Sequence, residues 1–154
     1  MNKTAKDVMQ TQVVTLSPND RLHIVQRLFY EEGIHGAPVV DEQGRVMGII
    51  TSTDILRAAA EADQVDATEP SYFRDDQDLS LFSWRNMPED FKERLQDVVV
   101  SDFMTEGVVQ VAPETPVRDV ARTLRENKIH RLLVVDGGAL CGIVSTFDLV
   151  SLLE

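Results

Sequence analysis

The sequence contains two similar segments, and this internal repeat constrains the fold more than any other feature does. Eleven positions of the first segment recur 95 residues later with the same residue type, beginning with Asp7 and its counterpart Asp102. After one deletion in a turn, residues 48–54 correspond to residues 142–148 at a spacing of 94. Similarity at a fixed spacing indicates repeated structural units. We therefore expect two units related by pseudo-twofold symmetry, with binding sites where the units meet.

The size of the chain indicates that the two units share one core. The chain has 154 residues, so each repeat has about 55, which is small for an independent hydrophobic core. Hydrophobic residues make up 43% of the chain, a fraction that supports a folded globule. No apolar run approaches the ~20 residues of a membrane span, and the N-terminus has no signal-peptide pattern. Cys141 is the only cysteine, so no internal disulfide can form, and we expect a cytoplasmic protein.

The charge of the chain argues against two classes of partner. The formal net charge is −11, from 15 basic and 26 acidic residues. Nucleic acids and anionic membrane surfaces both attract a basic protein face, so we expect neither as a partner. Residues 61–99 contain 11 acids and 4 bases and so carry −7 of this charge. The two repeats are closer to neutral, which leaves room for an anionic ligand there.

Each repeat follows the order β-α-β-β-α, which predicts a mixed α/β (α+β) fold of two packed repeats. The predicted elements of the first repeat are a helical turn over 4–9, a strand over 13–16, a helix from Asp20 as N-cap to Gly33, strands over 37–40 and 46–50, and a last helix from Thr51 or Ser52 to about Ala60. Those of the second repeat are a strand over 108–111, a helix capped by Thr115 with Val117, Val120, Ala121 and Leu124 on its buried face, strands over 132–135 and 140–144, and a last helix from about Thr146.

An insert separates the repeats, so the domain boundaries are expected at 1–60, 61–98 and 99–154. Its first part, residues 63–78, is acidic and predicted to be irregular and mobile, and Pro88 is predicted to open a helix that carries Phe91 and Leu95. The insert holds more than half of the nine aromatic residues of the chain: Tyr72, Phe73, Phe82, Trp84 and Phe91. A solvated linker has no need of so many aromatic side chains. They either pack back on the repeats, which we favour, or contact a protein partner.

The recurring residues form a pattern that resembles a known family. In chain order the pattern is Asp-x-Met, Val-Val, Ser-Pro, Ile-His-x-x-Pro-Val-Val-Asp and Gly-Ile-Ile-Thr-x-x-Asp. It resembles the CBS domain, named after cystathionine β-synthase, and the tandem arrangement resembles the paired CBS module of nucleotide-sensing proteins, including small stand-alone bacterial proteins. The resemblance covers about residues 4–60 and 99–154. In this family the two sheets pack together, and two clefts between the repeats commonly hold adenosine nucleotides.

The resemblance implies one Thr/Ser-x-x-Asp motif in each cleft. The aspartate of such a motif binds the ribose hydroxyls, and its hydroxyl residue lies near the phosphates. The motifs of this chain are Thr51 with Asp54 and Ser145 with Asp148. The residues implied to face the adenine are Ile34, His35 and Gly36 opposite Ser145 and Asp148, and Ile129, His130 and Arg131 opposite Thr51 and Asp54. The implied ligand-binding set is completed by Ile49, Ile143, Val14 and Val109.

The chemistry of these residues suits a nucleotide. A carboxylate can accept both hydrogens of a cis-diol, and the free N–H groups at a helix start favour a phosphate. Arg131 can add a two-pronged charged contact, whereas Gly36 occupies the corresponding position in the first repeat. We therefore expect the cleft of Thr51 and Asp54, which Arg131 faces, to bind more tightly.

Each of these features also has a structural interpretation. Hydroxyl and acid three residues apart fit a helix-capping box, so both motifs can simply be caps. Arg131 can instead form a surface ion pair with the acidic insert. The two histidines, His35 and His130, lack a second ligand type at a metal-binding spacing, so we expect polar cleft residues and no metal site.

The sequence favours a binding module over an enzyme. It has no nucleophile-and-base spacing, no glycine-rich phosphate loop and no metal quartet, so no catalytic residue and no required cofactor are expected. The preferred hypothesis is a regulatory sensor of AMP, ADP, ATP or S-adenosylmethionine that acts on another protein in trans. The alternative is an interaction scaffold with vestigial clefts, whose insert recruits an unknown protein. A homodimer is expected in either case, through the apolar helices over 55–60 and 149–153.

Overall fold

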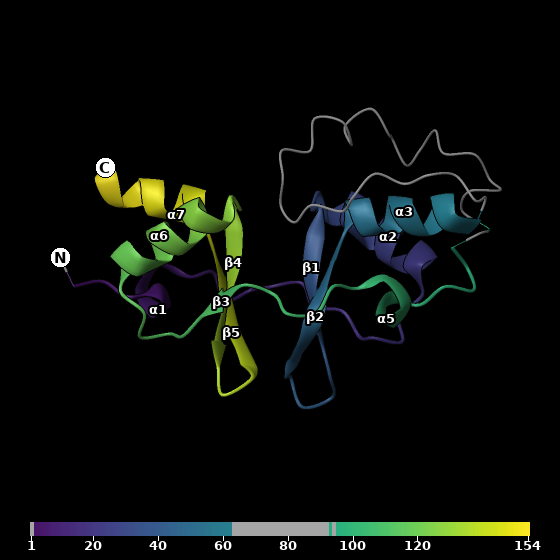
Figure 1. Ribbon diagram of the computed structural model, residues 1–154, viewed down its shortest axis with the longest axis horizontal. Coiled ribbons are helices and arrows are strands. Elements are labelled where there is room, and N and C mark those ends of the chain that lie inside the picture. Colours follow the sequence, from purple (N-terminus) through teal and green to yellow (C-terminus); the bar gives the residue numbers. More distant parts are fainter. Residues whose placement is uncertain (1, 63–92, 94) are drawn as a thin grey trace.

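The computed structural model describes residues 2–62, 93 and 95–154, which form two helix-and-strand units side by side. Figure 1 shows the strands of both units in the middle of the molecule and the helices on the outer sides. The α+β class expected from the sequence is confirmed, because both units combine a small sheet with helices that cover its outer face.

The first unit is a two-stranded sheet with two long helices. Strand β1 (Gly36–Val40) pairs antiparallel with β2 (Val46–Thr51). Helix α2 (Leu22–Glu32) precedes this hairpin, and α3 (Ser52–Ala62) follows it directly. Helix α2 ends at Gly33, whose φ of +66° suits glycine because it has no Cβ. The buried core of this unit consists of Leu16, Leu22, Val25, Phe29, Ala37, Val39, Ile50, Ile55, Ala58, Ala59, Leu95 and Val100.

The second unit has the same order with a shorter last helix. Its elements are β3 (Gln110–Val111), α6 (Val117–Asn127), β4 (Arg131–Asp136), β5 (Ala139–Ser145), α7 (Thr146–Val150) and a 3-10 turn, η3 (Ser151–Leu153). Strand β4 lies in the centre of the sheet, parallel to β3 and antiparallel to β5. The buried core of this unit consists of Ala5, Val120, Leu124, Ile129, Leu132, Val134 and Val144. Because this cluster has no residue in common with the core of the first unit, the prediction of one shared core was wrong.

Each unit receives its short leading helix from the other half of the sequence. Helix α1 (Ala5–Val8) begins the chain but packs on the second unit, where Ala5 is fully buried and its N–H donates to the Thr115 carbonyl at 2.8 Å. Helix α5 (Val100–Phe103) begins the second repeat but packs on the first unit, where Val100 is fully buried. Figure 1 shows α1 beside α6 and α5 beside α2 and α3. The two halves of the chain are therefore interlocked.

The chain crosses between the units at two equivalent points. After α1, Gln10 pairs with Ile143 of β5 through N–H···O=C bonds of 2.8 and 3.0 Å. After α5, Thr105 pairs in the same way with Ile49 of β2, at 2.8 and 2.9 Å.

Glycine allows these crossings to come close. A Cβ on Gly48 would lie 2.6 Å from the Thr105 carbonyl oxygen, and a Cβ on Gly142 would lie 2.6 Å from the Gln10 carbonyl oxygen. Both distances are shorter than real Cβ contacts, so any larger residue would have to move backbone. The glycine at the start of each Gly-Ile-x-Thr/Ser stretch is thus explained by the crossing segment beside it.

The two hairpins also touch at their turns, which lie at the same end of the molecule in Figure 1. Arg45 bridges Ala139, and its guanidinium donates to the Gly137 carbonyl at 2.9 Å. The Val46 N–H donates to the Gly138 carbonyl at 2.9 Å. The units are therefore held together at the crossings and at the hairpin turns.

Four local predictions were wrong. The strand expected over 13–16 is reduced to one parallel bridge from Leu16 to Val39. Asp20 is not the N-cap of α2: the N-cap is Arg21, and the Asp20 carboxylate instead accepts the Ser17 N–H at 2.9 Å.

Pro116 is the N-cap of α6, one residue later than expected, while the Thr115 hydroxyl accepts the Ala112 N–H at 3.1 Å. In both cases the polar side chain closes the turn before the helix by accepting an N–H from three residues earlier, and neither helix has a side-chain hydrogen bond at its N-cap. Ala121 is exposed, and the fully buried residues of α6 are Val120 and Leu124.

The predictions for the insert fall mostly on residues that the structure does not describe. Residues 63–92 and 94, which include all five aromatic residues and the helix expected at Pro88, lie outside the described residues. Leu95 is described and is fully buried in the core of the first unit. The described residues contain no helix long and apolar enough to cross a membrane.

Candidate ligand-binding site

The two Thr/Ser-x-x-Asp motifs occupy equivalent places in the two units. Thr51 is the last residue of β2, and Ser145 is the last residue of β5. Each hydroxyl residue is followed at once by a helix, α3 or α7, whose first turn contains the aspartate. The strand-to-helix junction therefore positions the hydroxyl, the carboxylate and the N–H groups of the helix start together.

The Thr51 motif is closed by hydrogen bonds within itself. The Thr51 N–H and hydroxyl both donate to Asp54 Oδ2, at 2.9 and 3.0 Å, and the Asp54 N–H donates back to Thr51 Oγ1 at 3.3 Å. These bonds form the reciprocal capping box that is the structural interpretation of the motif. Asp54 is 1% exposed. Burial raises the pKa of the Asp54 carboxyl above its usual value, against the opposing effects of the Thr51 hydrogen bonds and of Arg57.

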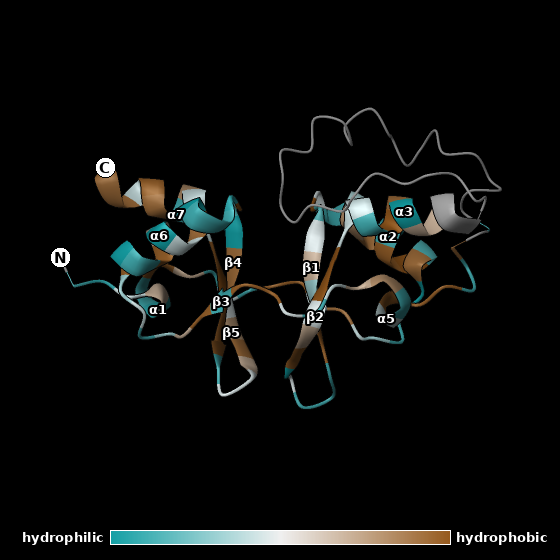
Figure 2. Ribbon diagram, viewed as in Figure 1, coloured by the Kyte–Doolittle hydropathy of each residue, from teal (hydrophilic) through white to brown (hydrophobic). Residues whose placement is uncertain are grey.

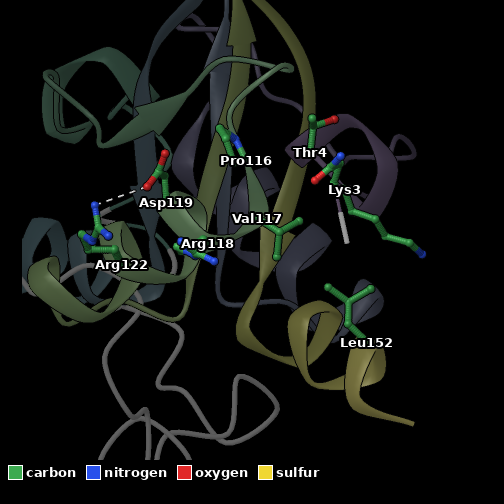
Figure 3. Close-up of a pocket in the computed structure, with 9 residues that line it drawn as sticks. Lys3, Thr4, Pro116, Val117, Arg118, Asp119, Arg122 and Leu152 are labelled. Carbon is green, nitrogen blue, oxygen red and sulfur yellow. Dashed lines mark hydrogen bonds and ion pairs between the residues drawn. The ribbon is translucent and has the colours of Figure 1, made fainter.

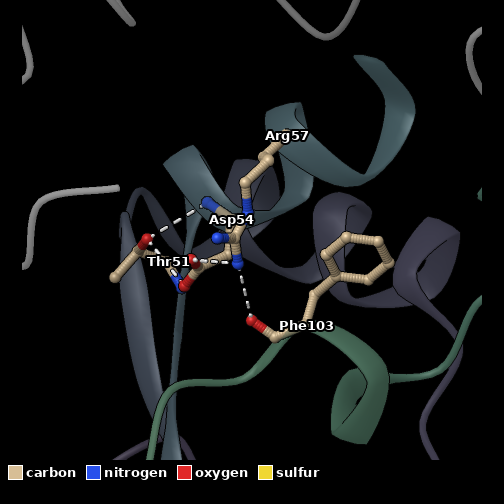
Figure 4. A network of polar contacts seen from close by, with 4 residues as sticks. All are labelled: Thr51, Asp54, Arg57 and Phe103. Carbon is tan, nitrogen blue, oxygen red and sulfur yellow. Dashed lines mark hydrogen bonds and ion pairs between the residues drawn. The ribbon is translucent and has the colours of Figure 1, made fainter. Parts of the chain in front are cut away.

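A third group, Arg57, completes this cluster (Figure 4). Its guanidinium lies 3.4 Å from Asp54 Oδ1 and donates to the Phe103 carbonyl at 3.4 Å. It also lies 5.7 Å from the centre of the Phe103 ring, within cation–π range. Arg57 thus links α3, which begins at the motif, to α5, which comes from the other half of the chain.

The Ser145 motif has the same cap but different surroundings. The Ser145 N–H and hydroxyl donate to Asp148 Oδ2 at 2.9 and 3.0 Å, and the Asp148 N–H donates to Ser145 Oγ at 3.1 Å. The second oxygen, Asp148 Oδ1, accepts the side-chain amide of Gln10 at 3.0 Å. Both Ser145 and Asp148 are only half-buried. This carboxylate is therefore in contact with solvent and is reached by a residue from the crossing segment.

The histidines lie beside the motif of their own unit. The Ser52 N–H donates to the His35 carbonyl at 2.8 Å, and the Thr146 N–H donates to the His130 carbonyl at 2.9 Å. Both histidine side chains are exposed. Arg131 is exposed as well and is paired with Ser145 in the β4–β5 ladder, so its backbone lies next to the Ser145–Asp148 motif. Its predicted position opposite Thr51 and Asp54 stays a prediction.

The apolar members of the expected set face different surroundings. Ile49 is fully buried at the crossing, and Ile129 is 8% exposed within the core of the second unit. Ile34 and Val109 are partly buried and pack against the cores of the first and second units, respectively. Gly36, Val14 and Ile143 are half-buried.

Two residues beside the motifs were missed by sequence reasoning, namely Gln10 and Arg57. A signal existed for Arg57, because an arginine three residues after an aspartate lies on the same side of a helix. Its counterpart 94 residues later is Ser151, and this break in the repeat could have marked the position. Nothing local indicated Gln10, because it reaches Asp148 across 138 residues of sequence.

The structure also contains cavities away from the motifs. A cavity of about 770 Å³ lies on the second unit, between the segment before α1, the start of α6 and the C-terminal turn (Figure 3). A smaller cavity of about 250 Å³ lies near the hairpin turns and is lined by residues such as Thr11 and Cys141. Among the described residues, no group of three or more His, Cys, Asp or Glu side chains could hold a metal ion.

Comparison with known proteins identifies the family. A sequence model of the CBS domain matches residues 5–61 and 100–154, which include both motifs. The chain belongs to the CBS domain family. The uncharacterized protein MJ1426 of Methanocaldococcus jannaschii is 34% identical to it over 153 residues, covering 96% of this chain and 89% of that protein.

Two solved CBS structures share the fold. The structure of CBSX2, a chloroplastic protein of Arabidopsis thaliana, in complex with AMP has a TM-score of 0.71 at 24% identity and covers 98% of this chain and 96% of its own. The CBS domain pair of MJ0100 in complex with 5′-methylthioadenosine and S-adenosyl-L-methionine has a TM-score of 0.68 at 23% identity, with 99% and 97% covered. Structural relatives of this chain therefore bind ligands that contain adenosine.

Proposed function

We propose that the chain is a regulatory module that binds an adenosine nucleotide at the Ser145–Asp148 motif and acts on a partner protein in trans. The observation that carries the proposal is the half-buried Asp148 carboxylate at a helix start, with Gln10 of the crossing segment beside it. A ligand bound there would touch both halves of the chain. It can shift their arrangement only by binding one arrangement better than another.

Each group at this motif has a matching role. Asp148 would exchange the neutral Gln10 amide for the two hydroxyl hydrogens of a ribose. The Ser145 hydroxyl and the exposed Arg131 guanidinium, next to it across the β4–β5 ladder, would lie on the phosphate side. AMP in CBSX2 supports the choice of ligand class.

The proposal is tested by calorimetric titration with AMP, ADP, ATP, adenosine and S-adenosylmethionine. Asp148→Ala should weaken nucleotide binding by about 1.5–3 kcal/mol, the range for a hydrogen bond to a charged group. Arg131→Ala should weaken AMP but not adenosine, because only AMP carries a phosphate. Asp136→Ala, which removes an exposed acid at the far end of β4, is the control and should bind like wild type.

Two results would contradict the proposal. Wild-type binding by Asp148→Ala would leave the motif as a helix cap only. The absence of heat or of any thermal shift with all five ligands would favour the scaffold hypothesis, because a ligand of the native state must stabilise it.

A further inference from the structure

The two aspartates differ in what holds their second oxygen. Asp54 Oδ2 accepts two hydrogens from Thr51, and Oδ1 faces the Arg57 guanidinium at 3.4 Å. A ribose diol needs a carboxylate oxygen that is free to accept both of its hydrogens. Both oxygens of Asp54 and both oxygens of Asp148 have a partner inside the protein, so the two motifs differ in how readily the partner of Oδ1 can be displaced.

The position of Arg57 is fixed by contacts other than Asp54. Its side chain is 25% exposed, its guanidinium donates to the Phe103 carbonyl, and it lies over the Phe103 ring. Its Nε is buried and has no hydrogen-bond partner among the residues that the structure describes. These features distinguish it from a surface arginine that moves freely in solvent, and they hold its charge against Asp54.

The second unit has no such group. The residue that corresponds to Arg57 is Ser151, whose hydroxyl donates to the Asp148 carbonyl at 2.6 Å and leaves the carboxylate alone. The partner of Asp148 Oδ1 is the neutral amide of Gln10, in an exposed hydrogen bond. A neutral, solvent-exposed hydrogen bond is easier to replace than a partly buried ion pair.

We propose that Arg57 keeps the Thr51–Asp54 motif closed to nucleosides, so that the chain binds one nucleotide, at Ser145–Asp148. This inference rests on the proposed function and adds the selectivity between its two motifs. A ribose at Asp54 would have to displace the guanidinium and leave a cation without its partner in a largely buried place. The same ribose at Asp148 displaces only an amide that solvent can reach. Arg57 is thus a residue that determines which motif is occupied.

The test uses Asp148→Ala as a background in which the Ser145–Asp148 motif is disabled. Calorimetry with AMP should give one site per chain for wild type and no site of wild-type affinity for Asp148→Ala. Arg57→Ser introduces the residue type that the second unit has at Ser151. The Arg57→Ser, Asp148→Ala double variant should therefore bind one AMP molecule per chain, at Thr51–Asp54. Arg57→Ser alone should bind two AMP molecules per chain.

Two variants control for loss of charge and for loss of packing. Arg27→Ser removes an exposed arginine that pairs with Glu31 at 3.0 Å on α2, and in the Asp148→Ala background it should restore nothing. Arg57→Met keeps an apolar stem against Phe103 and should restore the site if Arg57→Ser unfolds.

The outcomes separate this inference from the proposed function. No AMP binding by wild type overturns the proposed function. One site in wild type and none in either double variant with a folded chain overturns only the role of Arg57. Two equal sites in wild type also overturn it, because Asp54 would then be open with Arg57 present.

Discussion

At the scale of single residues, Asp54 is the one buried carboxylate among the described residues. It is 1% exposed, and its pKa is raised chiefly by burial, which costs the charged form more than the neutral form. A buried carboxylate of this kind is tolerated because Thr51 and Arg57 supply its hydrogen bonds. Its stability contribution must therefore depend on pH.

We expect the stability of wild type relative to Asp54→Asn to be highest below pH 3.8, the ordinary pKa of the group, and to fall as the pH rises through the raised folded pKa. The unfolded chain ionises first in this window and is thereby favoured. Thermal melting from pH 3 to pH 7 measures the difference, with Asp136→Asn as the control for loss of one exposed acid. A difference that instead grew with pH would contradict burial as the dominant cause.

At this scale the sequence predicted both motifs and their helix caps but not the difference in burial between them. Asp54 and Asp148 lie in the same short motif and make the same cap, so the motif alone does not distinguish them, and the sequence analysis preferred Asp54 only because of Arg131. The difference comes from Arg57, which is three residues from Asp54 on the same helix and is held by a tertiary contact with Phe103, and from Gln10, which reaches Asp148 from a distant part of the sequence.

At the scale of elements, the crossings explain why glycine recurs at equivalent places. Strands β2 and β5 each form backbone hydrogen bonds with a crossing segment, next to Gly48 and Gly142. The helices and the hairpins of both units were predictable because apolar periodicity and turn residues specify them locally. The packing of α1 and α5 on opposite units was not predictable, because a single helical turn carries too few residues to specify its partner.

Gly48→Ala should destabilise the fold by about 1–3 kcal/mol, the usual cost of forcing extra volume into a packed site. The added methyl would meet the Thr105 carbonyl oxygen at 2.6 Å, and a backbone atom cannot yield without breaking the pairing with Ile49. Urea unfolding measures the change. Met47→Ala, at a 38% exposed neighbour on the same strand, should stay within about 0.5 kcal/mol, and an equal loss for both would argue against a steric cause.

At the scale of the whole molecule, an unpaired apolar surface remains on the second unit. Phe147, Val150 and Leu153 are 79%, 56% and 86% exposed, and their spacing of three residues puts them on one side of the last helical turns. Figure 2 shows this end of the chain as largely hydrophobic. In the first unit, by contrast, Ile55 and its apolar neighbours on α3 are buried in the core. Of the two helices expected to form an interface, the last one therefore retains a free apolar face.

We propose that this face pairs with its copy in a homodimer, because large exposed apolar patches mark interaction sites. Light scattering at tens of micromolar should give twice the chain mass of 17.3 kDa for wild type. Phe147→Glu combined with Leu153→Glu should give the monomer mass, since burying two carboxylates in the interface is costly. Met47→Glu, on the hairpin, should leave the dimer intact. A wild-type monomer would refute the proposal.

The exchange of leading helices has a consequence for the origin of the chain. In an isolated repeat, the core position that Val100 fills in the first unit, or Ala5 in the second, would be empty, because the leading helix of each repeat packs on the other unit. Two copies of such a repeat could fill both core positions by exchanging their leading helices. An ancestral gene of one repeat would therefore have encoded an obligate pair, and its duplication and fusion would have turned a concentration-dependent assembly into one that forms within a single chain.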